Sequence, residues 1–361
     1  MNKMIFYINS IGHGGAERVI VQLANYFSIS NEVVLVTSYR CDSEYIFNSK
    51  IKRYVLDDKI INNKFIRNFQ RIIKLRKIIK KEKPVLIVSF MAEANARSIF
   101  ASLGLRTKTI VSVRNDPNVE YSGFLGSFVS KLVLPMADGC VFQTEEAKKF
   151  FPNSLRKKSI ILVNAVDSAF FNIDYNPNYD VITSIGRLEE QKNQKLILDA
   201  FSLIHKKYPE KELHFYGDGS LRKQLEQRAF SLGLASFVFF HGIANNIPEV
   251  LSKSGYFVLS SNYEGMPNCL MEAMAVGVPS ISTNCPCGGP NYLIKDGKNG
   301  FLVECNNSYS IYEKLDILMS DKKLHRAMSL NAKNSSKEYE SSVILKKWQC
   351  FLEERSGCDL K

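Results

Sequence analysis

Short apolar runs alternate with amphipathic stretches along most of this chain, and the runs have the length of buried β-strands. In the first half they fall at residues 4–8, 32–36, 53–56, 85–89, 109–113, 140–143 and 160–163. Between several of them apolar residues recur with a helical period, as in residues 16–27 and 66–81. This alternation predicts a parallel sheet covered by helices.

The pattern breaks over residues 164–179 and then begins again, with apolar runs at residues 181–185, 212–216, 238–241, 256–259, 280–283 and 300–303. We therefore expect an α/β protein with two Rossmann-like domains facing a cleft, residues 1–164 and 165–335. The tail, about residues 336–361, reads as a helix with Trp348, Phe351 and Leu352 on it. Such an apolar stripe needs cover, and the helix can pack back on the first domain or lie on the second.

The composition is that of a soluble globular protein, with 45% hydrophobic and 23% charged residues in a chain of 361. Residues 1–8 run straight into a strand without the apolar core and cleavage site of a signal peptide, so we expect a cytoplasmic protein. The eight cysteines are scattered except for Cys285 and Cys287. Their Cys-Pro-Cys spacing is poor for a metal, and free thiols in a reducing compartment are the better interpretation.

The net charge of +12 indicates an anionic partner. Nucleic acid, an anionic membrane surface and a phosphorylated substrate all fit this charge.

A turn between a strand and a helix carries two carboxylates, Glu264 and Glu272. Pro267 suits a first helical position, which places Glu264 in the loop and Glu272 more than one turn inside the helix. One carboxylate can then approach a sugar while the other binds a ribose. The alternative is a helix-start carboxylate and a solvated one, and the apolar neighbours of Glu272 disfavour it. Free N–H groups at the helix start, those of Asn268 and Cys269, form an anion site, and Leu270 is a further candidate there.

A second segment, residues 184–193, follows the first strand of the second domain and contains Arg187 and Lys192. We expect both side chains to leave the strand end, enter the next helix and face the cleft. Fixed cations there stabilise the charge of a diphosphate leaving group, whereas the simpler interpretation is two surface cations.

Glycines mark further turns at expected strand ends, at Gly14, Gly15, Gly217 and Gly242, the last preceded by His241. The first of these turns, Gly-His-Gly-Gly-Ala-Glu-Arg at residues 12–18, is not Gly-x-Gly-x-x-Gly, and no acid ends the second strand. A nicotinamide-dependent oxidoreductase is therefore disfavoured, although it stays an alternative beside a non-catalytic nucleotide- or nucleic-acid-binding module.

Taken together, these segments resemble glycosyltransferase family 4, the large retaining group with the GT-B fold. The resemblance covers nearly the whole chain and rests on Gly-Gly-Ala-Glu-Arg at 14–18, Gly-Arg-Leu…Gln-Lys-Asn at 186–193 and Gly-Asp-Gly at 217–219. Its strongest part is Glu-Gly-Met-Pro-Asn…Glu-Ala-Met-Ala at 264–275.

The resemblance implies that the second domain binds a nucleotide sugar, with UDP expected, and the first binds the acceptor. Glu264 would contact the donor sugar, Glu272 the ribose, and Arg187 and Lys192 the diphosphate, with no metal and no cofactor. Arg-Asn-Asp-Pro at 114–117 and Thr-Asn-Cys-Pro at 283–286 are most similar to bacterial capsule, O-antigen and exopolysaccharide enzymes. We therefore expect a lipid-linked saccharide acceptor and no nucleic-acid partner. The residues expected to contact the acceptor or the sugar are Arg114, Asn115 and Asp116.

The chain departs from the family pattern at three places. Val-Arg-Asn-Asp stands at 113–116 where many members carry a His, Tyr292 stands where relatives often have a Glu, and Asn-Ala at 164–165 replaces a common Asn-Pro. The first two differences bear on the donor sugar and the acceptor.

A basic amphipathic segment lies at residues 64–83, with nine Lys or Arg and one Glu. We expect its apolar stripe, residues 65, 69, 72, 73 and 79, to pack on the first sheet while its basic face meets an anionic inner-leaflet membrane surface. Residues 121–134 are a further candidate for membrane contact. Solvated charges without a membrane are the alternative.

Overall fold

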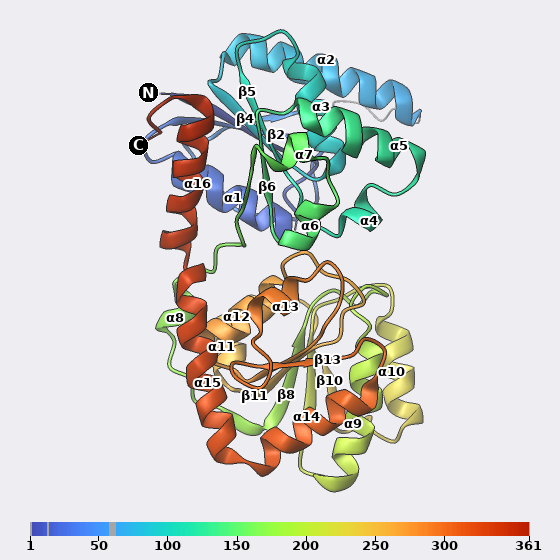
Figure 1. The fold of residues 1–361 in the computed structure, drawn as a ribbon. Helices are drawn as coiled ribbons and strands as arrows, with labels where there is room; N and C mark the ends of the chain where they lie inside the picture. The colour runs from blue at the N-terminus through green and yellow to red at the C-terminus, as the bar shows by residue number, and fades with distance from the viewer. Residues whose placement is uncertain (1, 13, 58–62, 361) are drawn as a thin grey trace. The chain divides into compact units, whose positions relative to one another are not determined.

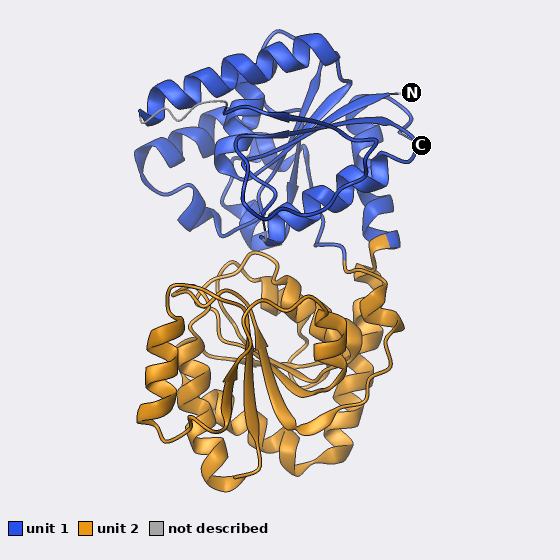
Figure 2. Cartoon of the chain, turned by 180° about the vertical axis from the view of Figure 1, so that it is seen from behind, with its two compact units in different colours: residues 1–165, 342–361 blue, residues 166–341 orange. Residues whose placement is uncertain are grey.

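The computed structural model describes residues 2–12, 14–57 and 63–360, which form two compact units (Figures 1 and 2). Unit 1 runs to Ala165 and takes in the chain again from Ser342, whereas unit 2 is Val166–Ser341. The chain therefore passes between the units twice, and the second crossing carries the C-terminal residues into unit 1.

Unit 1 is built on a seven-stranded sheet in the order β3-β2-β1-β4-β5-β6-β7, with every neighbouring pair parallel. The strands are β1 (Lys3–Ile8), β2 (Glu32–Thr37), β3 (Lys52–Val55), β4 (Leu86–Phe90), β5 (Lys108–Ser112), β6 (Gly139–Phe142) and β7 (Ser159–Ile161). The central strands are buried along most of their length, which explains why they read as continuous apolar runs.

The longer helices of unit 1 are α1 (Gly15–Phe27), α2 (Lys64–Glu82), α3 (Ala92–Ser102) and α16 (Ser341–Ser356). Shorter ones are α4 (Pro117–Glu120), α5 (Gly123–Phe128), α6 (Glu145–Lys149) and α7 (Asn153–Arg156), with a π-helical turn, η1 (Val129–Val133), and a 3-10 turn, η2 (Leu134–Met136). Helix α16 brings Trp348 onto Phe90 at the end of β4, with ring centroids 6.0 Å apart. This stacking buries the apolar stripe of the C-terminal tail.

Unit 2 has a six-stranded parallel sheet in the order β10-β9-β8-β11-β12-β13. Its strands are β8 (Asn178–Ile185), β9 (Glu212–Tyr216), β10 (Val238–Phe240), β11 (Ser254–Leu259), β12 (Ser280–Thr283) and β13 (Phe301–Val303). The two sheets confirm the predicted α/β fold class, and strand bounds differ from the predicted ones by at most three residues.

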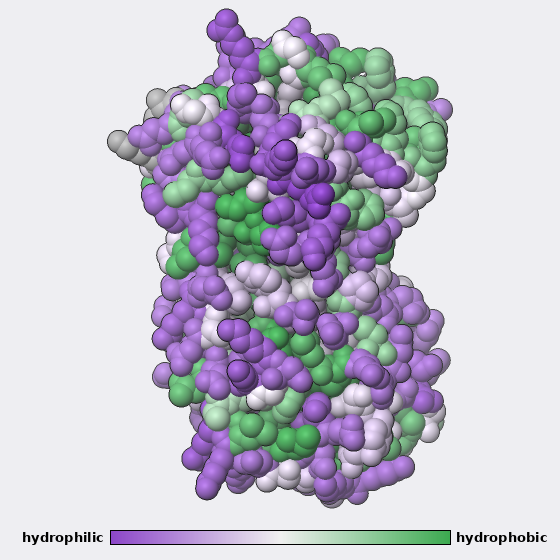
Figure 3. All heavy atoms as spheres, viewed as in Figure 1, coloured by the Kyte–Doolittle hydropathy of each residue, from purple (hydrophilic) through white to green (hydrophobic). Residues whose placement is uncertain are grey.

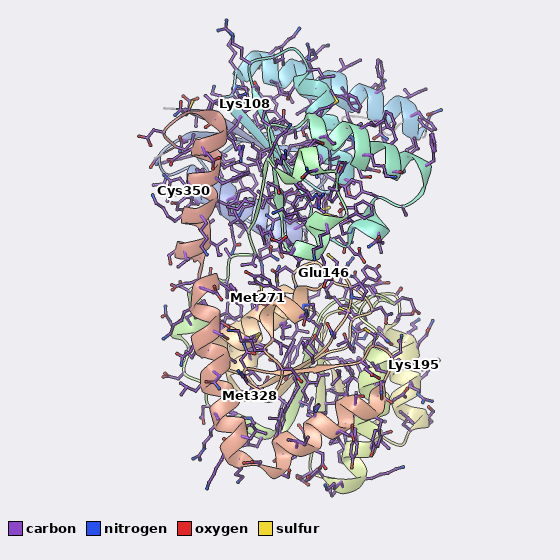
Figure 4. All side chains as sticks on the ribbon, in the orientation of Figure 1. Lys108, Glu146, Lys195, Met271, Met328 and Cys350 are labelled. Carbon is purple, nitrogen blue, oxygen red and sulfur yellow. The ribbon has the colours of Figure 1, made fainter. Side chains whose placement is uncertain are left out.

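Helices cover the sheet of unit 2 in two layers (Figure 1). One layer contains α9 (Gln194–Lys207), α10 (Arg222–Ser231) and α14 (Ser308–Ser320). The other contains α8 (Ala169–Asn172), α11 (Ile247–Ser252), α12 (Asn268–Val276) and α15 (Lys322–Ser336), followed along the chain by a 3-10 turn, η3 (Lys337–Tyr339); α13 (Gly289–Leu293) follows β12. Met271 of α12 and Met328 of α15, both labelled in Figure 4, are fully buried in unit 2.

Helix α2 corrects one expectation. Ile79 is buried as predicted, and Leu75, which lies outside the predicted stripe, is buried too, but Phe65 is 78% exposed and Phe69 65%. Arg71, expected on the basic face, is instead buried and donates from Nε to Asp57 at 2.9 Å. The apolar stripe is thus core only toward the C-terminal half of the helix.

No helix within residues 2–12, 14–57 and 63–360 is both long and apolar enough to span a bilayer.

Candidate functional site

Three glycine-containing turns meet at the carboxyl end of the unit 2 sheet, where β8, β9 and β10 stop side by side. Gly217 donates its N–H to the carbonyl of Gly242 at 2.7 Å, and Gly186 donates to Tyr216 at 2.9 Å. Gly217 has φ +134°, and a Cβ there would come within 2.0 Å of the Gly186 carbonyl oxygen. Only glycine allows these backbones to approach so closely. Ligands of open α/β sheets bind at this edge.

The loop after β8, residues 186–193, is joined to the loop after β11, residues 260–267. Ser260 Oγ donates to the carbonyl of Lys192 at 2.8 Å, and the Asn262 N–H donates to Gln191 at 2.8 Å. Gln191 Nε2 in turn donates to the Tyr263 carbonyl at 3.1 Å. These bonds fix the two loops as one rigid surface beside the start of α12.

Lys192 and Glu264 form an ion pair on this surface. Only 15% of the Lys192 side chain and 8% of the Glu264 side chain are exposed, and Ser261 Oγ donates to the same Glu264 oxygen at 2.7 Å. Burial lowers the pKa of Lys192, but the charges of Glu264 and Cys269 and the hydrogen bond to Glu264 together raise it by more, so the net pKa lies above its usual value. Lys192 therefore keeps its positive charge across the neutral range.

The backbone of Glu264 is held as firmly as its side chain. Its N–H donates to the Pro286 carbonyl at 2.6 Å, and its own carbonyl accepts from the Cys287 N–H at 2.9 Å. Gly289 lies against the same loop, because a Cβ there would meet the Gly265 carbonyl oxygen at 1.8 Å. The segment after β12 thus sets the position of Glu264.

Helix α12 begins at Asn268, with Pro267 one position earlier than the expected first helical residue, at the N-cap. Glu272 lies inside the helix and is only 4% exposed, and its neighbours Met271 and Ala273 are fully buried. Burial raises the pKa of Cys269 to about 11, and the charges of Lys192, Glu264 and Glu272 all act on this thiol. Both glutamates, Lys192 and the first turn of α12, including Leu270, are therefore brought together.

Arg187 lies in the same loop as Lys192 but is exposed, and its Nη2 donates to Gln191 at 3.4 Å. Both cations precede α9, which starts at Gln194, so the expectation that they enter that helix is wrong. Asn193, in the left-handed region at φ +47°, ends the loop and turns the chain into the helix.

His241 and Gly242 follow β10 at the outer side of the same sheet edge. His241 stacks on Tyr216, with ring centroids 4.5 Å apart and planes 12° from parallel. Arg222, at the start of α10, donates to the Phe240 carbonyl at 3.0 Å and so holds the end of β10.

In unit 1, Gly14 caps the start of α1 and Gly15 is its first residue. The neighbouring His13 of the predicted glycine turn lies outside the described residues. The side chain of Glu17 folds back toward Gly14, where a Cβ would stand 2.0 Å from its carboxylate.

Arg114 and Asp116 follow β5 and are both buried. The Arg114 guanidinium lies 4.2 Å from the Phe90 ring and 5.3 Å from the Trp348 ring, and donates to Asn164 at 2.9 Å. Asp116 caps α4 by accepting from the Asn118 N–H at 2.9 Å, while Asn115 is partly exposed. Their contact with an acceptor stays a prediction.

Ser261 and Asn262, which tie the site together, were not among the predicted site residues, and Gln191 was quoted only as part of a motif. Polar residues directly after a buried strand, Ser-Ser-Asn at 260–262, were the available signal. Among the described residues, no group of three or more His, Cys, Asp or Glu side chains is placed to hold a metal ion.

Residues 166–335, nearly the whole of unit 2, match the family model of glycosyl transferases group 1. This chain is a glycosyltransferase. The match gives no support to a nicotinamide-dependent oxidoreductase or a non-catalytic binding module.

Similar proteins extend the comparison of this glycosyltransferase to the full chain. A Campylobacter jejuni GalNAc-alpha-(1->4)-GalNAc-alpha-(1->3)-diNAcBac-PP-undecaprenol alpha-1,4-N-acetyl-D-galactosaminyltransferase is 28% identical over 96% of this chain and 97% of its own. The amylovoran biosynthesis glycosyltransferase of Erwinia amylovora is 25% identical over 98% of this chain and 100% of its own.

Among solved structures, an Anabaena protein, HepE, in complex with UDP-glucose has a TM-score of 0.82 at 18% identity, covering 99% of this chain and 100% of its own. Sucrose-phosphate synthase from Thermosynechococcus elongatus has a TM-score of 0.85 at 15% identity, with 99% and 100% covered. These likenesses show that the glycosyltransferase has the GT-B fold.

Proposed function

We propose that this glycosyltransferase transfers a sugar from a UDP-sugar to a polyprenyl-diphosphate-linked saccharide in surface-polysaccharide synthesis. The observation that carries the proposal is the buried ion pair of Lys192 and Glu264 beside the N-terminus of α12. A cation, a carboxylate and the N-terminus of a helix at one sheet edge suit a donor with a diphosphate and a sugar.

In this proposal each group has a separate task. Glu264 lies at the donor sugar, and Glu272 binds the ribose hydroxyls from inside α12. Lys192, Arg187 and the N–H groups of the first turn of α12 stabilise the diphosphate as the sugar bond breaks. The chain needs no metal for this step, and the anomeric configuration is retained, as the resemblance to family 4 implies.

The lipid-linked acceptor is supported by relatives. Two Campylobacter jejuni transferases and an Escherichia coli galactosyltransferase are named for acceptors on diphosphoundecaprenol. The second Campylobacter enzyme matches 95% of this chain at 27% identity, so the likeness includes unit 1, to which we assign acceptor binding through Arg114, Asn115 and Asp116.

A membrane-docking surface on unit 1 fits such an acceptor. At the N-terminal end of α2, Phe65, Ile66 and Phe69 are exposed, and on α5 Phe124 is 86% and Leu125 64% exposed. Helix α3 contacts both α2 and the η1 turn that continues α5, and Figure 3 shows hydrophobic side chains gathered over this part of unit 1.

The same helix adds positive charge to this surface. Exposed lysines follow the apolar end of α2, namely Lys77, Lys80, Lys81 and Lys83. Exposed aromatic side chains at one end of a helix and lysines along its other half suit the interface of an anionic bilayer. We place the enzyme at the cytoplasmic face of such a membrane, without a nucleic-acid partner.

A donor screen tests the proposed activity. UDP-, CDP-, GDP- and ADP-sugars are incubated with the enzyme and a membrane extract that contains undecaprenyl-diphosphate saccharides, and transfer is measured with radiolabelled sugar. We expect transfer from a UDP-sugar and a loss of about 100-fold or more in Glu264→Gln. Full activity in that variant, or no transfer from any nucleotide sugar, would contradict the proposal.

A further inference from the structure

A chain of hydrogen bonds crosses the outer strands of the unit 2 sheet and ends at His241. Glu212 Oε2 lies 3.0 Å from His214 Nε2, and His214 Nδ1 lies 3.0 Å from His241 Nε2. Glu212, His214 and Tyr216 occupy alternate positions of β9, so they share one face of the sheet, while Leu213 and Phe215 face the core.

The partners determine where the protons are. The Glu212 carboxylate only accepts, so His214 carries its proton on Nε2 and presents a lone pair on Nδ1. His241 must then donate from Nε2 to that lone pair. In the neutral state His241 is left with its Nδ1 as an acceptor.

His241 Nδ1 lies where the end of a nucleotide-sugar donor opposite its sugar would reach. The sugar and diphosphate groups are assigned to the loops after β8 and β11, and β10 lies two strands beyond β8 in the sheet. Adjacent strands are about 4.8 Å apart, so His241 is about 10 Å from the end of β8 along the edge. His241 is exposed although one of its ring faces lies on Tyr216.

We propose that His241 reads the nucleobase of the donor through its Nδ1, and that Glu212 and His214 are positioning residues that keep this nitrogen an acceptor. The inference rests on the proposed function and deepens it. An acceptor pairs with the ring N3–H of uracil, whereas cytosine presents a lone pair at the same ring position. The relay therefore selects uracil over cytosine, two bases of the same size.

Acid reverses the direction of the hydrogen bond between His214 and His241. One added proton on the relay makes His214 donate from Nδ1 to His241 Nε2, and His241 then carries its proton on Nδ1. Burial and the neighbouring His214 both lower the pKa of His241, which keeps the His241 ring uncharged at neutral pH. The charged and titratable groups around the relay are Glu212, Tyr216, Lys253, which acts on Tyr216, and Arg222 with Asp218 beside Gly242.

Calorimetric titration of the full chain with UDP and with CDP tests the inference. We expect wild type to prefer UDP by about 10-fold or more at pH 7.5, since cytosine would set its own ring lone pair against that of His241 Nδ1 and leave both acceptors unpaired. His241→Phe keeps the ring stack but removes the nitrogen, and the preference should fall below about 3-fold. His214→Phe should do the same, because His241 Nε2 then has no fixed partner.

Two further variants separate positioning from packing. Glu212→Gln keeps an oxygen acceptor for His214 and should retain the preference, whereas Glu212→Leu should lose it. His205→Phe, on α9 against Phe237, is the matched histidine control and should behave as wild type. The preference of wild type for UDP over CDP should also fall when the pH is lowered. The small preference expected for His214→Phe should not change with pH.

The two proposals fail in different ways. If wild type prefers UDP and both His241→Phe and His214→Phe keep that ratio while folded, the inference is wrong and the proposed function stands. If wild type binds neither UDP nor CDP, the proposed function itself is contradicted.

Discussion

Lys192 and Glu264 pair across two loops of unit 2 and are 72 residues apart in the chain. Because both side chains are largely buried, neither charge can be removed without leaving the other in a poorly solvated place. The pair thus couples the stability of unit 2 to the chemistry proposed for its edge.

A double-mutant cycle measures this coupling. Lys192→Met or Glu264→Gln alone should lower the free energy of unfolding by about 3 kcal/mol, since each leaves one buried group unmatched. The double variant should lose less than the sum of the two, by about 1–3 kcal/mol in urea denaturation. Strict additivity would show that the two charges do not interact in solution.

Gly217→Ala should disrupt the glycine contacts at the ends of β8 and β9. Its Cβ would meet the Gly186 carbonyl at 2.0 Å in addition to requiring a positive φ. Gly233→Ala is the matched control, because Gly233 has φ +74° and nothing within 4 Å of its Cβ. We expect about 1 kcal/mol lost in the control and about 3 kcal/mol or more at Gly217, measured by thermal and urea unfolding. Equal losses would contradict the close approach.

Membrane docking should depend on the exposed end of α2. Replacing Phe65 and Phe69 by Ser should reduce flotation with phosphatidylglycerol vesicles by about 10-fold or more, because each buried Phe contributes about 2 kcal/mol. Phe230→Ser is the control, since Phe230 is 77% exposed but lies on α10 of unit 2. Binding should also weaken at high salt as lysine contacts are screened. Unchanged flotation of the double Ser variant would rule out this surface.

The order of strands and helices could be predicted from the sequence because buried parallel strands leave a local signature. The pairing of Lys192 with Glu264 could not, since it depends on two loops that meet only in the folded unit. The glycines, Pro267 and the two glutamates nevertheless located the edge where the loops meet.

The expectation that the whole apolar stripe of α2 packs on the sheet was wrong for a similar reason, because it too depends on contacts that form only in the folded unit. Helical periodicity places Phe65 and Phe69 on one stripe with Ile79, but it does not say where the sheet beneath the helix ends. Arg71 is buried because Asp57 pairs with it. Asp57 lies outside the helix, so the distribution of charges along the helix does not predict this pair.

Glu82 should make the stability of unit 1 depend on pH. Burial raises its pKa, but Lys52, Tyr54 and Lys3 together lower it by more, to about 2 from 4.5. A folded pKa below the unfolded one gives stability that is present above pH 4.5 and lost as the pH falls toward 2. Glu82→Gln should therefore cost on the order of 3 kcal/mol at pH 7 and progressively less below pH 4.5, by urea unfolding. Glu226→Gln, in an exposed pair with Arg222, should show no such trend.

Arg114 offers a test that separates a structural role from a contact with the acceptor. Within the described part of the chain its Nε and Nη2 have no hydrogen-bond partner, and burial lowers its pKa to about 9. An apolar replacement of such a group costs little, so Arg114→Met should change the free energy of unfolding by about 1 kcal/mol or less.

Arg97→Met is the contrasting variant, because Arg97 is buried and bonded to Glu93, Asn68 and Asn9. It should cost about 3 kcal/mol or more. If Arg114 meets the acceptor, Arg114→Met should keep its fold and its affinity for UDP while transfer to the lipid-linked saccharide falls by about 10-fold or more. Full transfer in a stable Arg114→Met would leave this side chain with its packing on Phe90 and Trp348 alone.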